Sequence, residues 1–489
     1  TLPFDDIINT GVLLPLFNEI CESGYDNDDN PSQIVAAFFD KFFDEASEKD
    51  RINLLFRFIQ YIERQVVLFD AVEDAAFPVV NNMDGRGTLR SMKEEAEEKN
   101  KTGALKAYLE QFRIRTVLTA HPTQFYPGEV LGIITDLAKA IEKDDLLLIK
   151  KLMAQLGRTP FFKKEKPTPY DEAVRLIWYL ENVFYHAAGN IFNYIQNNIF
   201  GDTELHNNLV NLGFWPGGDR DGNPFVTAEI TLKVAERLKT TVLKNYYRDV
   251  RRLKRRITFY EADRLVEAIE SKLYDAIYNV GGASGFTCEA FYETLLKIRQ
   301  ILIEKHKSLF VEEVNDLINK TKLFGFHFAA LDIRQDSRVH HHVITTVIAE
   351  TRARKMGLFP ENYETLPEAE KAGILGQVKG ELTTDMLTDE ITRATLGSVY
   401  AMKTIQRQNG EPGCNRYIIS NNQSMLNVME VFAMIRLCGW ENPAADIVPL
   451  FETVDDLQRS KNIMEALYNQ PDYAAHLKRR GNKQTIMLG

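Results

Sequence analysis

Six short apolar runs, separated by long helical segments, constrain the fold of this chain more than any other feature of its sequence. The runs are rich in aliphatic and β-branched residues, and each of the first five ends in a polar cluster: HPTQ, GGDRDGNP, RQDS, NNQS and ETVDD. Strands that alternate with helices pair in parallel, and such sheets carry functional side chains at the carboxyl ends of their strands. We expect strands at 115–120, 209–215, 323–333, 416–420, 446–451 and 484–488.

This alternation predicts a predominantly α-helical α/β fold, an elaborated TIM-like barrel of parallel strands with large helical insertions. A closed barrel of this type has eight strands, and six are present. We expect an N-terminal helical region at 1–114 and a partial barrel at 115–489, with insertions at about 125–208, 226–320 and 340–413. Residue 1 is Thr, and Gly489 directly follows an apolar run, so we expect a fragment of a longer chain.

Residues 50–69 carry the clearest helical periodicity. Their apolar residues recur at steps of three and four, which places them in one stripe along a helix: Ile52, Leu55, Ile59, Ile62, Val66 and Phe69. Similar patterns predict helices within 130–153, 172–198, 226–278 and 289–320. Polar or Gly/Pro-rich stretches predict loops or insertions near 80–104, 157–169, 280–285 and 355–382.

Composition excludes several classes of protein. With 59 basic and 69 acidic residues, the formal net charge is -10, which argues against a general nucleic-acid binder. No apolar run reaches the roughly eighteen residues of a membrane span. The four cysteines are scattered, without the spacing of a disulfide or zinc framework, which is typical of reduced thiols in a cytoplasmic protein.

The first two polar clusters contain groups suited to acid–base chemistry and anion binding. His121 follows the first strand and is a candidate general acid or base; the alternative is a histidine satisfied in the core. In the second cluster, Gly217 and Gly218 allow backbone N–H groups to approach an anion closely. Arg220 offers a planar fork for phosphate or carboxylate, which Asp219 and the aspartate after Arg220 can orient. The alternative is a tight turn.

The third and fifth clusters supply a cation and a carboxylate. Arg334 is expected at the end of a long apolar strand, pointing into the barrel mouth, where it can hold a phosphate; the alternative is a salt bridge with Asp332 or Asp336. Glu452 closes the fifth strand. Mg²⁺ takes one or two carboxylates together with water and substrate oxygens, so we predict Glu452 as a metal ligand.

Two other motifs are interpreted without a catalytic role. His340, His341 and His342 are consecutive and cannot all face one point from a helix, so we do not expect them to form a metal site. Residues 248–256, RDVRRLKRR, are strongly basic. Given the acidic total, we interpret them as a solvated helix face or an interface rather than a nucleic-acid arm.

Six segments, in order along the chain, resemble the phosphoenolpyruvate carboxylase family: VLTAHPTQ, RTPFFKKEKPTPYDEA, GGDRDGNPFVT, LDIRQDS, VPLFETVDDL and YAAHLKRRGNKQTIMLG. The resemblance implies a mostly helical protein built round an eight-stranded barrel, usually a homotetramer (a dimer of dimers). It implies that phosphoenolpyruvate and bicarbonate are joined, with Mg²⁺ or Mn²⁺, to give oxaloacetate and phosphate. This is an anaplerotic carbon dioxide fixation that feeds the tricarboxylic acid cycle.

The resemblance also implies roles for individual residues. Bicarbonate attacks the phosphoryl group to give carboxyphosphate and the enolate of pyruvate; carboxyphosphate then releases CO₂, which the enolate attacks. His121 assists the breakdown of carboxyphosphate, and Arg334 grips the phosphoryl group or bicarbonate. Glu452 is one of two carboxylate ligands of a metal that stabilises the enolate. Asp219 and Arg220 shape the mouth.

The chain departs from the family pattern where Leu426-Asn427 replaces a Ser-Asp pair and where Ala330 replaces an arginine found in many relatives. The family's Y-S-D-S-x-K-D and G-R-G-G segments, and its sites for feedback inhibitors, would follow Gly489, so we expect little or no activity from this chain alone. Two alternatives stay open. One is a barrel aldolase or phosphoryl-transfer enzyme acting on a similar keto-acid phosphate, and the other is a non-catalytic helical assembly module.

Overall fold

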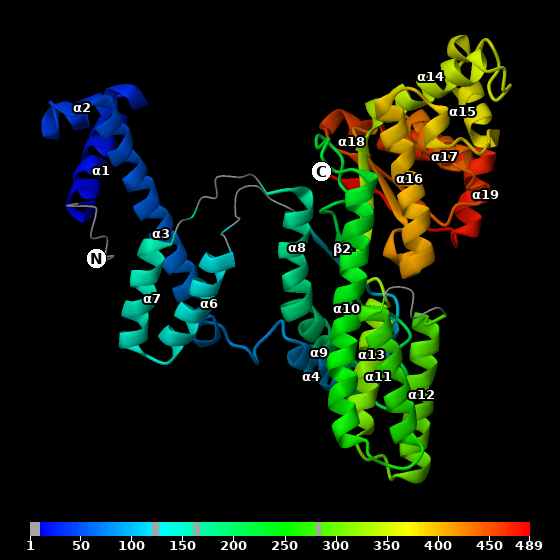
Figure 1. The fold of residues 1–489 in the computed structure, drawn as a ribbon, viewed down its shortest axis with the longest axis horizontal. Helices are drawn as coiled ribbons and strands as arrows, with labels where there is room; N and C mark the ends of the chain where they lie inside the picture. The colour runs from blue at the N-terminus through cyan, green and yellow to red at the C-terminus, as the bar shows by residue number, and fades with distance from the viewer. Residues whose placement is uncertain (1–9, 120–125, 127, 160, 162–166, 280–284) are drawn as a thin grey trace. The chain divides into compact units, whose positions relative to one another are not determined.

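The chain forms two compact units (Figure 1). The computed structural model describes residues 10–119, 126, 128–159, 161, 167–279 and 285–489. The first unit contains residues 1–92 and 121–166, and the second contains 93–120 and 167–489. The chain therefore passes from the first unit to the second and back before it completes the second.

One parallel sheet organises the second unit. Its strands pair in the order in which they occur along the chain, and the sheet curls as part of a barrel does. The strands are β1 (Ile114–Leu118), β2 (Val210–Phe214), β3 (Ala330–Asp336), β4 (Arg416–Ser420), β5 (Asp446–Phe451) and β6 (Met487–Leu488). The predicted fold class, a helix-rich TIM-like barrel with six parallel strands present, is confirmed.

The third strand was predicted too early in the chain. Leu323 and Phe324 form the end of a helix, and residues 325–329 form turns in which Gly325 and Phe328 have positive φ angles. The error arises because Phe324 and Phe328 are buried among aromatic side chains of neighbouring helices, so the run is apolar without being extended. Periodicity alone does not separate a buried strand from a buried helix end. As a result, Arg334 lies within β3 and not after it.

Helices account for most of the second unit. Two five-residue π-helical segments, η1 (Leu180–Phe184) and η2 (Gln196–Phe200), interrupt or end the helices predicted within 172–198. The α-helices are α5 (Thr102–Leu109), α8 (Pro169–Tyr179), α9 (Tyr185–Ile195), α10 (Ala228–Arg256), α11 (Ala262–Tyr278), α12 (Cys288–Lys305), α13 (Val311–Phe324), α14 (Ser337–Ala353), α15 (Glu368–Gln377), α16 (Glu390–Asn409), α17 (Met425–Leu437), α18 (Val454–Asn469) and α19 (Pro471–Arg479).

The long helix α10 connects the sheet to the helices around it. It begins where the Thr227 side chain accepts a hydrogen bond from the Ile230 N–H, and its last turn carries Lys254, Arg255 and Arg256, which suit the negative end of the helix dipole. It packs along α8, α11, α13 and α16 (Figure 1). None of the helices in the described ranges combines the length and apolar character needed to cross a bilayer.

Two of the predicted loops contain helices. The stretch 80–104 includes α4 (Leu89–Glu98) and the start of α5, and 355–382 includes α15. Charged residues such as those of SMKEEAEEK are good helix formers when they lie on an exposed face, so a polar stretch is not by itself a loop. In these two stretches the alternative of an insertion, rather than a simple loop, is the one that the structure shows.

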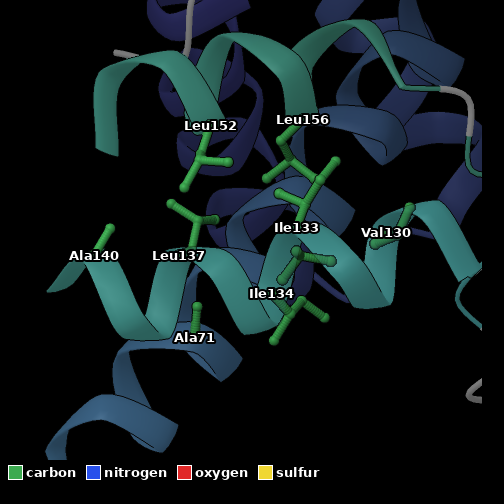
Figure 2. Packing of buried hydrophobic residues seen from close by; sticks show 9 residues of the cluster. Ala71, Val130, Ile133, Ile134, Leu137, Ala140, Leu152 and Leu156 are labelled. Atoms are coloured by element: carbon green, nitrogen blue, oxygen red, sulfur yellow. The ribbon is translucent and has the colours of Figure 1, made fainter. Parts of the chain in front are cut away.

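The first unit is entirely helical in its described part. Its helices are α1 (Thr10–Asp26), α2 (Pro31–Phe42), α3 (Glu48–Val80), α6 (Gly128–Glu142) and α7 (Leu146–Arg158), with the beginning of α4. Ile133, Leu137 and Leu156 interdigitate between α6 and α7, and Ala71 of α3 closes the cluster (Figure 2). The predicted helix at 50–69 is therefore part of a longer helix.

Most of the apolar stripe predicted on that helix is exposed, and Leu55 is the member that packs, against the cluster of Phe38, Phe39 and Phe58. Ile59 and Val66 remain about half exposed, and Phe69 is 72% exposed. The residues of α3 that pack against α6 are Val67 and Ala71, which lie on a neighbouring face of the helix. Apolar residues at steps of three and four define a stripe along a helix. They do not show which face of the helix a neighbouring helix covers.

Candidate active site

The carboxyl ends of β2, β3 and β5 bring polar side chains together at one edge of the sheet. Parallel strands in register present their carboxyl ends on the same side, and the loops after them form a shared rim. The register pairs Phe214 of β2 with Leu331 of β3, and Ile419 of β4 with Pro449 of β5. The residues that follow these positions are therefore neighbours in space although they are far apart in the chain.

The loop after β2 is held against β3 by backbone hydrogen bonds. The Arg334 N–H donates to the Gly218 carbonyl at 3.1 Å, and the Arg220 N–H donates to the Arg334 carbonyl at 2.9 Å. A Cβ atom at Gly218 would lie 2.1 Å from the Asp332 carbonyl oxygen, so only glycine permits this approach. The GGDRD segment thus continues the sheet beyond β2 and fixes Asp219 beside Arg334.

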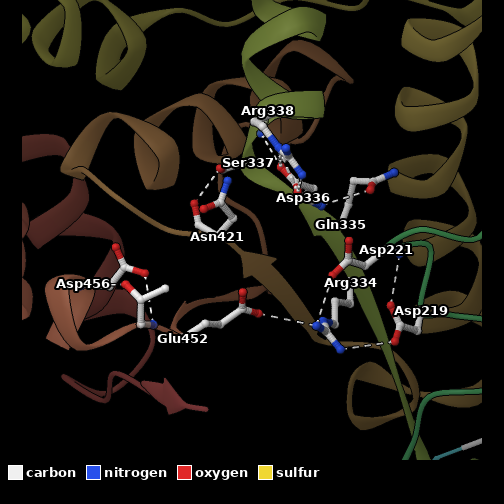
Figure 3. A network of polar contacts seen from close by, with 11 residues as sticks. Asp219, Asp221, Arg334, Gln335, Asp336, Ser337, Arg338, Asn421, Glu452 and Asp456 are labelled. Carbon is white, nitrogen blue, oxygen red and sulfur yellow. Dashed lines mark hydrogen bonds and ion pairs between the residues drawn. The ribbon is translucent and has the colours of Figure 1, made fainter. Parts of the chain in front are cut away.

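Three carboxylates surround the Arg334 guanidinium (Figure 3). Its Nη2 lies 3.0 Å from Oδ2 of Asp221 and 3.6 Å from Oε1 of Glu452, and its Nη1 lies 3.4 Å from Oδ2 of Asp219. The Trp215 ring lies 5.2 Å from the guanidinium carbon, within the range of a cation–π contact. The structure therefore brings together the predicted residues Arg334, Asp219 and Glu452.

Two expectations for the charged residues near Arg334 are wrong: the alternative of a salt bridge with Asp332 or Asp336, and the orientation of the Arg220 fork by its flanking aspartates. Asp332 pairs with Arg115 and Asp336 pairs with Arg338, so neither forms a salt bridge with Arg334. The aspartates that flank Arg220 contact the guanidinium of Arg334 instead of orienting the fork of Arg220. The reason is the parallel bridge between Asp219 and Arg334, which turns both aspartates toward β3.

Arg220 lies in the same loop but its guanidinium points toward another element. Its Nη1 donates to the Ala394 carbonyl of α16 at 2.8 Å, while its buried Nε has no hydrogen-bond partner in the described part of the chain. Burial lowers the pKa of this guanidinium. Arg220 therefore links the loop to α16 through Nη1, and its Nε–H remains without an acceptor among the described residues.

Glu452 is the carboxylate at the rim with the greatest freedom. It directly follows β5, its side chain is partly exposed, and among the described residues its carboxylate forms one ion pair, the long one with Arg334. By contrast, burial raises the pKa of Asp219, an effect that the adjacent Arg334 opposes. A single accessible carboxylate fits the donor set of a hydrated Mg²⁺ or Mn²⁺ that also takes substrate oxygens. Within the described ranges, no three His, Cys, Asp or Glu side chains lie together as a complete metal site.

The residues next to Glu452 begin a helix. The Thr453 side chain accepts from the Asp456 N–H at 3.1 Å, and the Asp456 carboxylate accepts from the Thr453 N–H at 3.2 Å, which forms a capping box for α18. Asn427, one of the departures from the family pattern, has a comparable role. Its side-chain oxygen accepts from the N–H groups of Gln423 and Ser424 at the start of α17.

The other histidines of the sequence analysis lie in three separate environments. His340 is buried against the Tyr417 hydroxyl at 3.1 Å, His341 contacts Glu430 at 2.7 Å, and His342 contacts Asp389 at 3.1 Å. Their rings point to different partners, as expected for consecutive positions on α14. His121, the predicted catalytic histidine, lies outside the described residues. The strand before it, β1, ends at Leu118.

Sequence reasoning missed two residues of this site. Asp221 makes the shortest contact with Arg334, and Trp215 lies against its guanidinium. Asp221 was treated as a partner of Arg220 because the two are adjacent in sequence. A signal for Trp215 was available. A large aromatic residue two positions before a pair of glycines can place its ring face against a cation bound near that loop.

Comparison with known proteins places the chain in one family. The family model described as phosphoenolpyruvate carboxylase matches residues 69–279 and 282–489. The chain is similar to phosphoenolpyruvate carboxylase from Nitrosomonas eutropha, with 25% identity over 83% of this chain and 50% of the relative. The protein of that name from Gloeobacter violaceus is 25% identical over 79% of this chain and 49% of the relative. The protein of that name from Shewanella loihica is 26% identical over 78% of this chain and 47% of the relative.

The chain spans about half the length of the curated relatives it matches. The family match nevertheless extends over all the strands from β1 to β6 and over the loops that carry Asp219, Arg334 and Glu452. The chain belongs to the phosphoenolpyruvate carboxylase family.

Proposed function

We propose that the protein carboxylates phosphoenolpyruvate with bicarbonate to give oxaloacetate and phosphate. The observation that carries the proposal is the position of Arg334, which lies at the carboxyl edge of the sheet, with Asp219, Asp221 and Glu452 around its guanidinium. A fixed guanidinium beside an accessible carboxylate suits a reaction between two anions and a divalent cation. Family membership supplies the choice of reaction.

Arg334 is proposed to bind an oxyanion of the substrates. Its contacts with Asp219 and Asp221 hold the guanidinium plane in place, since both aspartates belong to a loop that is hydrogen-bonded to the same strand. Its contact with Glu452 is the longest of the three. We expect a phosphoryl group or bicarbonate to replace that contact, because a bidentate pair with an oxyanion is stronger than a single long ion pair.

Glu452 is proposed to hold Mg²⁺ or Mn²⁺ once a substrate oxyanion has replaced its contact with Arg334. When bound, such an ion supplies positive charge close to the oxygen that becomes negative in the enolate of pyruvate. The second carboxylate that the family resemblance implies is not among the residues of this chain. We therefore propose that this chain alone has little or no activity.

His121 is proposed to assist the breakdown of carboxyphosphate into CO₂ and phosphate. Support comes from its place in the sequence: it follows β1, whose residues Thr116 and Leu118 pair in register with Leu212 and Phe214 of β2. The segments after β1 and β2 therefore leave the same edge of the sheet. A homotetrameric state and a cytoplasmic location are parts of the same proposal.

The test is the bicarbonate dependence of phosphate release from phosphoenolpyruvate by the protein purified from its natural source. We expect release only when bicarbonate is present, with one oxaloacetate formed for each phosphate. Release that proceeds equally without bicarbonate would support the aldolase or phosphoryl-transfer alternative. His121→Asn is expected to abolish most oxaloacetate formation. If both the fold and oxaloacetate formation are unchanged in that variant, His121 has no catalytic role. If the original protein releases no phosphate from phosphoenolpyruvate at all, the assembly-module alternative is favoured.

A further inference from the structure

A basic cavity lies in the second unit between α9 and the carboxyl-terminal half of α10. Its volume is about 360 Å³, and its wall includes Asn245, Arg248, Arg251, Arg252 and Arg255 of α10, with His186 of α9. Ala228, the first residue of α10, lies close to the glycine-rich loop of the rim. Asn245 lies about 25 Å further along the helix axis, so this cavity is separate from the candidate active site.

The spacing of the arginines directs them to one side of α10. Positions 245, 248, 252 and 255 follow each other at steps of three and four, which places them on one helix face. Val250 and Leu253 lie on the opposite side and are buried in the core of the unit. The helix is thus fixed by its apolar face, and the arginines are held over the cavity by a rigid element.

The ion pairs of the wall leave positive charge in excess. Four arginines and one aspartate, Asp249, line the cavity. Arg248 pairs with Glu181 and Arg252 pairs with Asp249. Asp249 is shared further, since it accepts a hydrogen bond from the Tyr185 hydroxyl at 2.6 Å and lies 3.4 Å from Lys320 Nζ.

The remaining arginines are less well neutralised. Arg251 lies 3.8 Å from Glu270, which also pairs with Lys254 at 2.6 Å. Arg255 forms no ion pair with any residue of the described ranges. Because Asp249 and Glu270 each contact two cations and Arg255 has no carboxylate partner among the described residues, the wall keeps an excess of positive charge.

A buried amide provides an independent indication of a ligand. Asn245 is 2% exposed, and its Nδ2 has no hydrogen-bond acceptor among the described residues. Leaving a buried donor unpaired is costly, and native proteins rarely do so. Because this side chain lines the cavity, an acceptor bound there would satisfy the donor.

We propose that this cavity binds a phosphate group carried by a small organic molecule. Several guanidinium groups and one amide donor line the cavity along one face of α10, and this number of donors suits the three or four acceptor oxygens of phosphate better than the two of a carboxylate. The cavity lies at the small end of the range for ligand sites. It has room for a compact organic group beside the phosphate.

The experiment is a calorimetric titration of the whole chain, at low ionic strength in chloride, with inorganic phosphate and with glycerol phosphate. We expect saturable binding of one molecule per chain, with glycerol phosphate the tighter of the two. Arg255→Gln and Asn245→Leu are each expected to weaken binding about tenfold, the effect of losing one hydrogen bond to a charged group. Equal affinity for the two probes would identify free phosphate as the ligand.

Lys254→Gln is the matched control. It removes one positive charge from the same helix turn, but Lys254 pairs with Glu267 and Glu270 and does not line the cavity. Its effect on affinity should stay within about twofold. Absence of saturable binding of both probes overturns the proposal, and so does an effect of Lys254→Gln equal to that of Arg255→Gln. If Asn245→Leu impairs folding, Arg255→Gln decides alone, because Arg255 is exposed.

Discussion

Arg115 on β1 reaches across β2 to form a two-contact ion pair with Asp332 on β3. Its Nη2 lies 2.6 Å from Oδ1 and 2.8 Å from Oδ2 of the carboxylate. The strand between them offers no obstacle, since its residue at this level is Gly213, where a Cβ atom would lie 2.8 Å from the Arg115 Nε. Trp215 donates from its indole N–H to the same carboxylate at 3.1 Å. The pair therefore ties the first three strands together on one side of the sheet.

Asp332→Asn is expected to lower the free energy of unfolding by about 3–5 kcal/mol, the usual cost of leaving one member of a buried ion pair alone. Asp332 is buried and Arg115 is mostly covered, so water cannot replace the lost charge. The measurement is urea unfolding followed by circular dichroism. Asp336→Asn is the control, because the partner Arg338 is 80% exposed and asparagine also caps a helix. Similar losses in the two variants would contradict the role given to the Arg115–Asp332 pair.

Gly213→Ala tests the same contact from the strand between the two residues. The added methyl group would meet the Arg115 side chain and Cγ2 of Val117 at less than 3.0 Å. We expect a loss of about 1–3 kcal/mol from this overpacking, again in urea unfolding. Gly397→Ala is the control, since its Cβ would meet only Ala228 at 3.6 Å within helix α16. That substitution should be neutral or stabilising by up to about 1 kcal/mol. An unperturbed Gly213→Ala would show that Arg115 does not need the glycine.

Protonation of His340 is expected to destabilise the fold in acid. Burial lowers the pKa of this imidazole to about 3, against an ordinary value near 6.5. Below about pH 6.5 the unfolded chain therefore binds a proton that the folded chain does not. Its contribution to stability is present above that pH and is lost as the pH falls towards 3. The loss should be about 2 kcal/mol between pH 7 and pH 5.

The measurement for His340 is a comparison of urea unfolding at the two pH values in the original protein and in His340→Gln. Glutamine keeps a polar contact to the Tyr417 hydroxyl but does not titrate. The variant is expected to be less stable at pH 7, yet to lose about 2 kcal/mol less than the original protein on acidification. The same loss in both proteins would assign the acid sensitivity to other groups.

The strands were predictable because each contains a short run of β-branched and aliphatic residues, and the first five of these runs end at a polar cluster. The exception, 323–333, shows the limit of this reasoning: Phe324 and Phe328 are apolar because helices cover them, not because they lie in a sheet. The same limit applied to the helix at 50–69, where the sequence defined a stripe of apolar residues but a neighbouring helix covered a different face.

The candidate site was predictable because its residues belong to the polar clusters expected at the carboxyl ends of the strands. Arg334, Asp219 and Glu452 belong to three such clusters, and the structure brings them together. Contacts between distant segments were not predictable. Arg115 and Asp332 are 217 positions apart, and no local spacing relates them. The contact of Asp219 and Asp221 with Arg334, rather than with Arg220, also depended on how the glycine-rich loop aligns with β3. The sequence of the loop alone does not show that alignment.

Arg334→Gln is expected to lower kcat/KM for phosphoenolpyruvate by about 10²–10³-fold in the protein from its natural source, the usual effect of removing one preorganised donor to a developing charge. Arg334→Lys should recover little, because an ammonium cannot contact Asp219, Asp221 and a substrate oxyanion with one planar fork. Arg338→Gln is the matched control, since it removes an exposed arginine that pairs with Asp336 near the same rim and should change kcat/KM less than twofold. Urea unfolding of each variant checks that the fold persists. An Arg334→Gln protein that folds normally and retains its kcat/KM would remove Arg334 from the site and, with it, the observation on which the proposed function depends.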